Sequence, residues 1–450
     1  MSSIFDRDIL IGIRKEFVAM SYEAYRDSSL AFETKQLHYG YNPAEHYKSK
    51  AVPIYQTTAF ELGSFERCKR LFSFREEGHS YVRYSNPTNE VLEKRIAALE
   101  GGAAAVSMSS GMSAISNTFF NLAQQGDEIA AVKTIYGGTT TLLSKVLPPY
   151  GIKTNWVENA DDPDSYRAAI TDKTKAVYVE SLGNPGMNVI DLETVASIAH
   201  EHGIPLVVDN TFATPYLLRP FEFGADIVVH SSTKYLSGHG TIISGLVVEK
   251  GGFDWWNGKF PQFEEFYKDY TGKIDENSLR NTAFTRRLRI RYLTEFGSSL
   301  SPIGAFLVLQ GLETLSLRMQ RHADNALKLA KFLKNHPKIL DVAYPSLPGS
   351  PYYGLAQKYF PRGSGAILNI RVKGGLKAAK RVLRKVRIFD YLVNVGDAKS
   401  LIVHPATSTH YGLPEDVKEK AGVYDDTLRI SVGIENIDDL IRDMAQALED

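Results

Sequence analysis

The sequence predicts an α/β protein in which helices cover a mostly parallel sheet and a smaller α+β domain follows. From about residue 100 onward, short apolar runs rich in β-branched residues alternate with segments of helical spacing, a pattern typical of parallel strands joined by crossover helices. The composition, 43% hydrophobic and 23% charged, is typical of a globular protein. Because 450 residues exceed what one hydrophobic core usually organises, we expect two domains.

Six apolar segments are short enough and rich enough in β-branched residues to be buried strands rather than helices. They comprise residues 104–108, 128–132, 176–180, 205–209, 226–230 and 242–248. Crossover helices are expected in the segment after Gly111 and over residues 191–202, where Asp191 is a candidate N-cap.

The N-terminal part of the chain lacks this alternation. Residues 1–60 scatter Asp, Ser and Tyr without a period, so we expect an N-terminal arm that packs on another body, such as a neighbouring subunit. Residues 61–300 form the large domain. Within it, residues 251–281 place Trp, Phe and Tyr among Gly, Lys and Asp, and we expect a long aromatic loop there.

Residues 301–450 are expected to form the second, α+β domain. A long helix is predicted over residues 300–333, partly interrupted by Pro302 and Gly304. Strands are predicted near residues 365–372 and 427–432.

Charge and cysteine content exclude several classes of function. Lys+Arg and Asp+Glu both number 52, so no net basic field attracts nucleic acid or a membrane surface, and no apolar run approaches the ~20 residues of a membrane span. The single cysteine, Cys68, excludes an intrachain disulfide framework and a multi-cysteine zinc site, and we expect no metal. Because the N-terminus lacks the features of a signal peptide, we expect a cytoplasmic protein.

The most informative motif, over residues 229–240, has the sequence VHSSTKYLSGHG. It places Lys234 just past a buried strand, where partial desolvation lowers the pKa of an ammonium group and suits it to Schiff-base chemistry. Ser231 and Thr233 are candidate donors to a phosphate. Most lysines in loops are simply solvated, so this interpretation depends on the neighbouring motifs.

Two neighbouring motifs support the interpretation of Lys234 as a Schiff-base lysine. Asp209 closes the preceding buried strand, where a carboxylate can pair with a pyridinium nitrogen, although such an aspartate is more often a cap or turn former. Ser107 to Ala114 follow a strand and open a helix, so the N–H groups of Gly111 and Met112 can bind a phosphate; an ordinary turn with serine caps is an equal alternative. Neither the dinucleotide fingerprint nor the P-loop spacing is present at this turn.

With these residues in place, the chain resembles the pyridoxal-phosphate enzymes of Cys/Met metabolism from about Thr34 to the C-terminus. The pattern Ser-x-Thr-Lys-Tyr-x-x-Gly-His, which begins at Ser231, is specific for that family. The resemblance implies an aminotransferase-like fold of type I with a seven-stranded sheet in its large domain. It also implies a homotetramer, built from dimers that share active sites.

The resemblance assigns roles residue by residue. Lys234 corresponds to the lysine that binds pyridoxal phosphate and acts as general base, Asp209 to the partner of the ring nitrogen, and Tyr136 to the tyrosine that stacks on the ring. The phosphate is held by Ser231, Thr233, Gly111 and Met112, and by Tyr81 and Arg83 from the neighbouring subunit.

Three further positions complete the implied site. Arg429 matches the arginine that binds the substrate α-carboxylate, a task that suits its two-point donor geometry. Asn394 and Asn184 occupy positions that contact the substrate carboxylate and the cofactor face. His404 and His410 lie near the substrate side, and we leave both out of the catalytic set.

Three features distinguish members of the family. Gly138 replaces the cysteine of methionine γ-lyases, and Lys399 stands where cystathionine-handling enzymes often have glutamate. The aromatic insertion, over residues 252–261, and the segment 393–400 resemble those of O-acetylhomoserine sulfhydrylases. Met112 departs from the glutamine common there.

We therefore expect γ-replacement on O-acetyl-L-homoserine by sulfide, giving homocysteine and acetate. A methionine or cystathionine γ-lyase and a cystathionine γ-synthase remain alternatives. The sequence leaves open the acyl group on homoserine, and whether sulfide or a thiol is the nucleophile.

Overall fold

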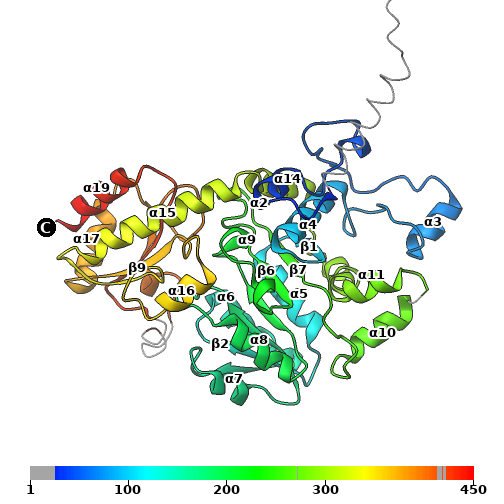
Figure 1. Cartoon of the computed structure of the whole chain (residues 1–450), viewed down its shortest axis with the longest axis horizontal. Coiled ribbons are helices and arrows are strands. Elements are labelled where there is room, and N and C mark those ends of the chain that lie inside the picture. Colours follow the sequence, from blue (N-terminus) through cyan, green and yellow to red (C-terminus); the bar gives the residue numbers. More distant parts are fainter. Residues whose placement is uncertain (1–25, 271, 413–417, 419–421, 450) are drawn as a thin grey trace, which may run out of the picture.

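The computed structural model describes residues 26–449, except 271, 413–417 and 419–421. Within these residues, strands form two separate sheets (Figure 1). The larger sheet lies at the centre of the molecule, and the C-terminal sheet lies at one end, among α15, α17 and α19. The described residues contain no helix that is both long enough and apolar enough to cross a bilayer.

The larger sheet has seven strands in the described chain, in the order β1-β7-β6-β5-β4-β2-β3. Only β7 runs antiparallel to its neighbours, so the sheet is mostly parallel, as predicted. The strand bounds are β1 Ala104–Met108, β2 Glu128–Val132, β3 Lys153–Val157, β4 Thr174–Glu180, β5 Leu206–Asp209, β6 Ile227–His230 and β7 Gly245–Glu249. The six predicted strands are confirmed, whereas β3 was not predicted.

Helices α4 and α5 follow the local rules of helix capping, whereas the side chain of Asp191, the predicted N-cap of α8, makes no capping hydrogen bond. In α4, Pro87–Glu100, the Asn86 side chain accepts from the Thr88 N–H, and Gly101 ends the helix in a left-handed conformation. In α5, Gly111–Leu122, the Ser110 side chain accepts from the Ser113 N–H. The predicted helix over residues 191–202 is confirmed as α8, Leu192–Glu201.

Shorter helical elements complete the larger unit. They are α2 Phe32–His38, α3 Phe65–Phe72, α6 Gly137–Thr141, α7 Pro163–Ala169, α9 Thr214–Leu217, α12 Ala283–Arg287 and α13 Thr294–Phe296.

The aromatic segment at 251–281 is not the loop that we predicted, because it contains α10, Pro261–Tyr270, and α11, Glu276–Asn281. Phe263, Phe266, Tyr267 and Tyr270 are spaced by three, four and seven residues, a helical period that we did not recognise. Trp255, only 1% exposed, stacks on Phe263 with ring centroids 4.4 Å apart. The insertion therefore packs into the main hydrophobic core, where Trp255 also stacks on Phe284, outside the segment.

The long helix predicted over residues 300–333 is two helices, α14 Pro302–Leu312 and α15 Leu315–Lys334. Pro302 interrupts nothing, because it is the first residue of α14 and Ser301 caps that helix through the Gly304 N–H. The break falls at residues 313–314 instead.

The C-terminal sheet has the order β10-β11-β12-β9-β8 within the described residues. Its strands are β8 Ile339–Ala343, β9 Ile367–Val372, β10 Asp390–Tyr391, β11 Leu401–Val403 and β12 Thr427–Ser431. Helices α16 Tyr353–Tyr359, α17 Gly375–Lys385 and α19 Ile437–Leu448 accompany it. The two strands predicted in this region are β9 and β12.

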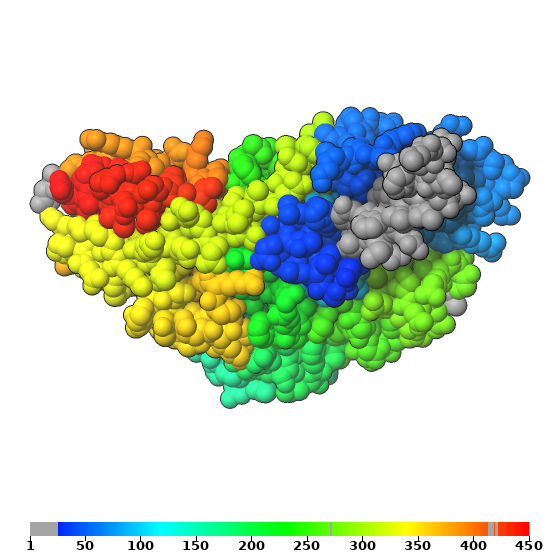
Figure 2. All heavy atoms as spheres, turned by 45° about the horizontal axis from the view of Figure 1, so that its top comes forward, coloured from blue at the N-terminus to red at the C-terminus, as the bar shows by residue number. Residues whose placement is uncertain are grey.

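Part of the predicted N-terminal arm packs on its own chain. Residues 1–25 lie outside the described part. In α2, the Gln36 amide donates to Ser316 Oγ at 3.0 Å and accepts from the Ser316 N–H at 3.1 Å. Figure 2 shows this dark blue segment against the yellow-green helices α14 and α15. Contact of the arm with a neighbouring subunit, and the domain boundaries at 60 and 300, stay predictions.

Candidate active site

The candidate site lies where three parallel strands end side by side. Glu180, Asp209 and His230 are the last residues of β4, β5 and β6, which are neighbours in the sheet. Glu180 pairs in register with Asp209. Lys234 is the fourth residue after the end of β6. The carboxyl ends of adjacent parallel strands thus bring together polar groups that are distant in the sequence.

Lys234 lies between the two sheets. Its Nζ donates to Asn394 Oδ1 at 2.5 Å. Burial, together with the nearby positive charge of Arg429, lowers the pKa of Lys234 to about 8. The turn that carries Asn394 comes close to the backbone next to Lys234 at Gly396. There φ is +79°, and an added Cβ would lie 2.7 Å from the Tyr235 nitrogen. Only glycine fits this contact, and no local pattern in the sequence predicts it.

Asp209 is almost enclosed and accepts hydrogen bonds on both oxygens. Its Oδ1 accepts from the Thr211 N–H at 3.0 Å and from the Thr211 hydroxyl at 2.5 Å, while its Oδ2 accepts from the Tyr178 hydroxyl at 3.3 Å. Burial raises the pKa of Asp209, and these donors oppose the rise. No lysine or arginine forms an ion pair with it in the described chain. The carboxylate is therefore available to a cation that enters the site.

Tyr136 is the N-cap of α6 and is about half exposed. Its N–H donates to Glu180 Oε1 at 2.6 Å. A Cβ added at Gly138 would lie 2.5 Å from Cε1 of the Tyr136 ring. Gly138 therefore leaves room for the ring in its present orientation. Glu180 was missed in the sequence, although it ends a predicted strand beside Asp209.

The turn before α5 forms an anion cradle with the start of the Lys234 loop. Within the described residues, the N–H groups of Gly111 and Met112 have no acceptor, as expected at a helix N-terminus. A Cβ at Gly111 would lie 2.8 Å from the Ser231 hydroxyl, so the two segments are in direct contact. The Thr233 hydroxyl donates instead to the Ser244 carbonyl at 3.1 Å, so its single proton is engaged.

Arg429 is buried in the middle of β12 and is 5% exposed. Its Nη1 donates to Asn184 Oδ1 at 3.2 Å, and no carboxylate forms an ion pair with it among the residues described. Burial lowers its pKa to about 10. A buried guanidinium without a counter-ion is costly, and an anionic ligand would remove that cost.

Tyr81 and Arg83 do not join this cluster within the chain. The Arg83 guanidinium donates to the Thr294 carbonyl and lies over the Tyr81 and Tyr84 rings, 5.5 and 5.3 Å from their centroids. Tyr81 is exposed and forms an isolated bridge with Ala59. None of these partners belongs to the Lys234 cluster.

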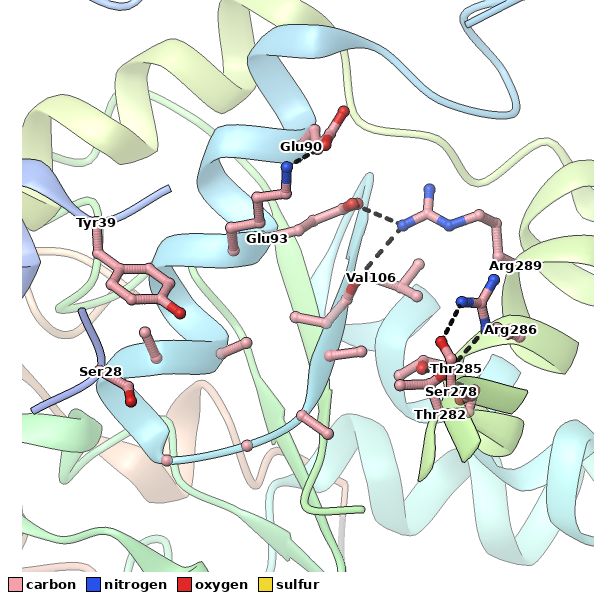
Figure 3. A pocket seen from close by; sticks show the side chains of 18 of the residues that line it. Ser28, Tyr39, Glu90, Glu93, Val106, Ser278, Thr282, Thr285, Arg286 and Arg289 are labelled. Atoms are coloured by element: carbon pink, nitrogen blue, oxygen red, sulfur yellow. Dashed lines mark hydrogen bonds and ion pairs between the residues drawn. The ribbon is translucent and has the colours of Figure 1, made fainter. Parts of the chain in front are cut away.

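A separate cavity of about 690 Å³ lies between α4, β1 and α12 (Figure 3). Its charged side chains all have partners in the described chain, within the lining or beside it. Arg289 bonds Glu93, Lys94 bonds Glu90, and Arg286 bonds Ser278. No residue of the Lys234 cluster lines this cavity.

Comparison with known proteins gives a consistent result. The family model of the Cys/Met metabolism PLP-dependent enzymes matches residues 33–449. Homocysteine synthase of Schizosaccharomyces pombe is 48% identical over 421 residues, which cover 93% of this chain and 98% of that one. O-acetyl-L-homoserine sulfhydrylase of Leptospira meyeri is 46% identical over 426 residues, which cover 93% and 96%.

A solved structure agrees with these relatives. It is a Campylobacter jejuni chain described as an O-acetylhomoserine (thiol)-lyase, 41% identical, with a TM-score of 0.88 over 94% of this chain and 100% of that one. It carries N'-pyridoxyl-lysine-5'-monophosphate, in which a lysine is joined to the cofactor.

Proposed function

Because the chain belongs to the Cys/Met metabolism PLP-dependent enzymes, we propose that it replaces the acetoxy group of O-acetyl-L-homoserine with sulfide. The Cγ–O bond breaks, acetate leaves with the electron pair, a Cγ–S bond forms, and the products are L-homocysteine and acetate. The observation that carries this proposal is the position of a low-pKa lysine, Lys234, close to a buried and uncompensated Arg429. An amino-acid substrate supplies the missing carboxylate.

The residues present fit pyridoxal phosphate, the cofactor of this family. The contact of Gly111 with Ser231 and the two free N–H groups of α5 suit a phosphate. Asp209, which forms no ion pair with a lysine or arginine among the described residues, suits a protonated ring nitrogen, and Lys234 suits the aldehyde. When bound, the cofactor withdraws electrons from the carbon atoms next to the substrate amine.

Each side chain of the site has a separate role in the reaction. Arg429 binds the α-carboxylate with its two parallel donors, and Asn184 fixes the guanidinium. Lys234, with a pKa near working pH, takes the proton from Cα and returns it. Asn394 holds its Nζ in place through the hydrogen bond of 2.5 Å. Tyr136 would pack against the ring of a bound cofactor.

The assembly is part of the proposal. Tyr81 and Arg83 act on the phosphate of a neighbouring copy in a homotetramer of dimers with shared active sites. The chain around them supports this, because Tyr47, Phe65 and Phe72 are exposed large hydrophobic residues. We place the enzyme in the cytoplasm.

The test uses purified holoenzyme with O-acetyl-L-homoserine, with and without sulfide, and quantifies homocysteine and 2-oxobutanoate. Homocysteine that forms only with sulfide, with little keto acid without it, supports the proposal. Keto acid in equal amounts in both tubes would identify a γ-lyase instead. Parallel reactions with the O-succinyl ester and with methanethiol test the acyl group and the nucleophile.

A further inference from the structure

Glu180 and Asp209 form a pair of buried carboxyl groups, of which the proposed mechanism uses only Asp209. They end adjacent parallel strands and are paired in register, so their side chains project from the same face of the sheet. Glu180 is 6% exposed and Asp209 is 7% exposed. Two carboxylates enclosed this closely cannot both ionise without a large cost, because each destabilises the charge of the other.

No lysine or arginine of the described chain forms an ion pair with either carboxyl group. The titratable side chains that act on the pair are Tyr178 on β4 and His230 at the end of β6, and the backbone N–H of Tyr136, at the start of α6, donates to Glu180. His230 is itself bound to Glu100 at 2.6 Å, and both of these side chains are fully buried. The His230 side chain is therefore already engaged by another carboxyl group.

The hydrogen bonds distinguish the two members. Asp209 accepts three, from the Thr211 N–H, the Thr211 hydroxyl and the Tyr178 hydroxyl. Glu180 accepts one, from the Tyr136 N–H. Since donors stabilise the ionised form, the negative charge belongs on Asp209 and the proton on Glu180. Burial and the charge of Asp209 raise the pKa of Glu180 well above its ordinary value, which agrees with this assignment.

We propose that Glu180 is a positioning residue that carries a proton in the working enzyme, so that Asp209 alone bears the negative charge available to the ring nitrogen of a bound cofactor. Glu180 also fixes the Tyr136 backbone through the bond to its N–H, and so connects the two faces of the cofactor site. The proposal rests on the proposed function for the identity of the site, whereas its readouts do not depend on the substrate.

The test compares holoenzyme with the variants Glu180→Gln and Glu180→Ala. A glutamine is the neutral near-isostere of a protonated glutamate and still accepts from the Tyr136 N–H. We expect Glu180→Gln to keep the pH titration of the cofactor's visible absorbance within about 0.3 units of wild type and kcat/KM within about threefold. Glu180→Ala, which frees Tyr136, lowers kcat about tenfold or more.

A second readout is the infrared difference spectrum of wild type minus Glu180→Gln at neutral pH, in which a protonated carboxyl band should appear. A shift of the absorbance titration by about one unit or more in Glu180→Gln, with a carboxylate band in the difference spectrum, would overturn the proposal, because it means that Glu180 is ionised. Failure of Glu180→Gln to fold would also overturn it. Absent turnover of O-acetyl-L-homoserine with both readouts as expected would refute the proposed function alone.

Discussion

Replacement of Arg429 by methionine should stabilise the substrate-free protein while it destroys substrate binding. Arg429 is 5% exposed, and its one hydrogen-bond partner within the described chain is the neutral Asn184 Oδ1 at 3.2 Å. Burial lowers its pKa from 12.5 to about 10, which corresponds to a cost on the order of 3 kcal/mol for keeping the charge in the folded state. This cost is fully present below pH 10, and it falls only as the pH rises from 10 towards the unfolded value.

Methionine has a similar volume and no charge, so it removes this cost and loses one hydrogen bond worth about 1 kcal/mol. We therefore expect Arg429→Met to raise the free energy of unfolding of the apoprotein by about 1 to 2 kcal/mol at pH 7. Loss of a charge-assisted carboxylate contact should raise KM for the amino-acid substrate by about 100-fold or more. The assays are urea denaturation of the apoprotein and steady-state kinetics of the holoenzyme.

Arg318 provides the matched control. It is also 5% exposed, and burial lowers its pKa to about 10 as well. Its guanidinium, however, donates to the carbonyls of Tyr235 at 2.8 Å and Gly311 at 2.6 Å. Arg318→Met leaves these buried carbonyl acceptors without a donor and should destabilise the fold by about 2 kcal/mol or more. Destabilisation by both variants to the same extent would refute the assignment of Arg429 as an uncompensated cation that awaits a carboxylate.

Three further predictions concern Lys234 and its neighbours. The rate at which pyridoxal phosphate binds the apoprotein should rise about tenfold per pH unit up to pH 8 and then level off, because the lowered pKa of Lys234 makes its reactive neutral amine available there. Stopped-flow absorbance measures this rate, and a rise that continues to pH 10 would contradict the prediction. Asn394→Asp places a carboxylate at a position now 2.5 Å from Nζ and should shift this profile upward by about one unit or more, whereas Asn394→Gln should not. Gly396→Ala should destabilise the holoenzyme by about 1 to 3 kcal/mol, because φ is +79° and the new Cβ meets the Tyr235 nitrogen at 2.7 Å; an unchanged thermal midpoint would contradict this contact.

The sequence predicted the parts of the fold and site that depend on local composition. Strands β4, β5 and β6 are continuous apolar runs that end in polar residues, so their burial and the position of Asp209 follow from the pattern. Strand β3 was missed because its residues, Lys153–Val157, are largely polar and lie at the edge of the sheet.

Other features depend on contacts between distant segments. The hydrogen bond of Lys234 with Asn394 spans 160 residues, and no local signal gives the close approach of Gly396. Glu180 ends a strand that was predicted, yet its importance appears only when β4 and β5 are known to be neighbours. The break between α14 and α15 contains neither Pro nor Gly, so no local signal marks it.

The central claim is that one cluster at the carboxyl ends of β4, β5 and β6, built around Lys234, carries out the reaction. Its most direct test is borohydride reduction of the holoenzyme, followed by proteolysis and mass spectrometry of the peptides. We predict that the pyridoxyl group is found on Lys234, in stoichiometric amount, and that prior incubation with O-acetyl-L-homoserine lowers this labelling. A pyridoxyl group on any other lysine, or full labelling of Lys234 in the presence of saturating substrate, would contradict the account.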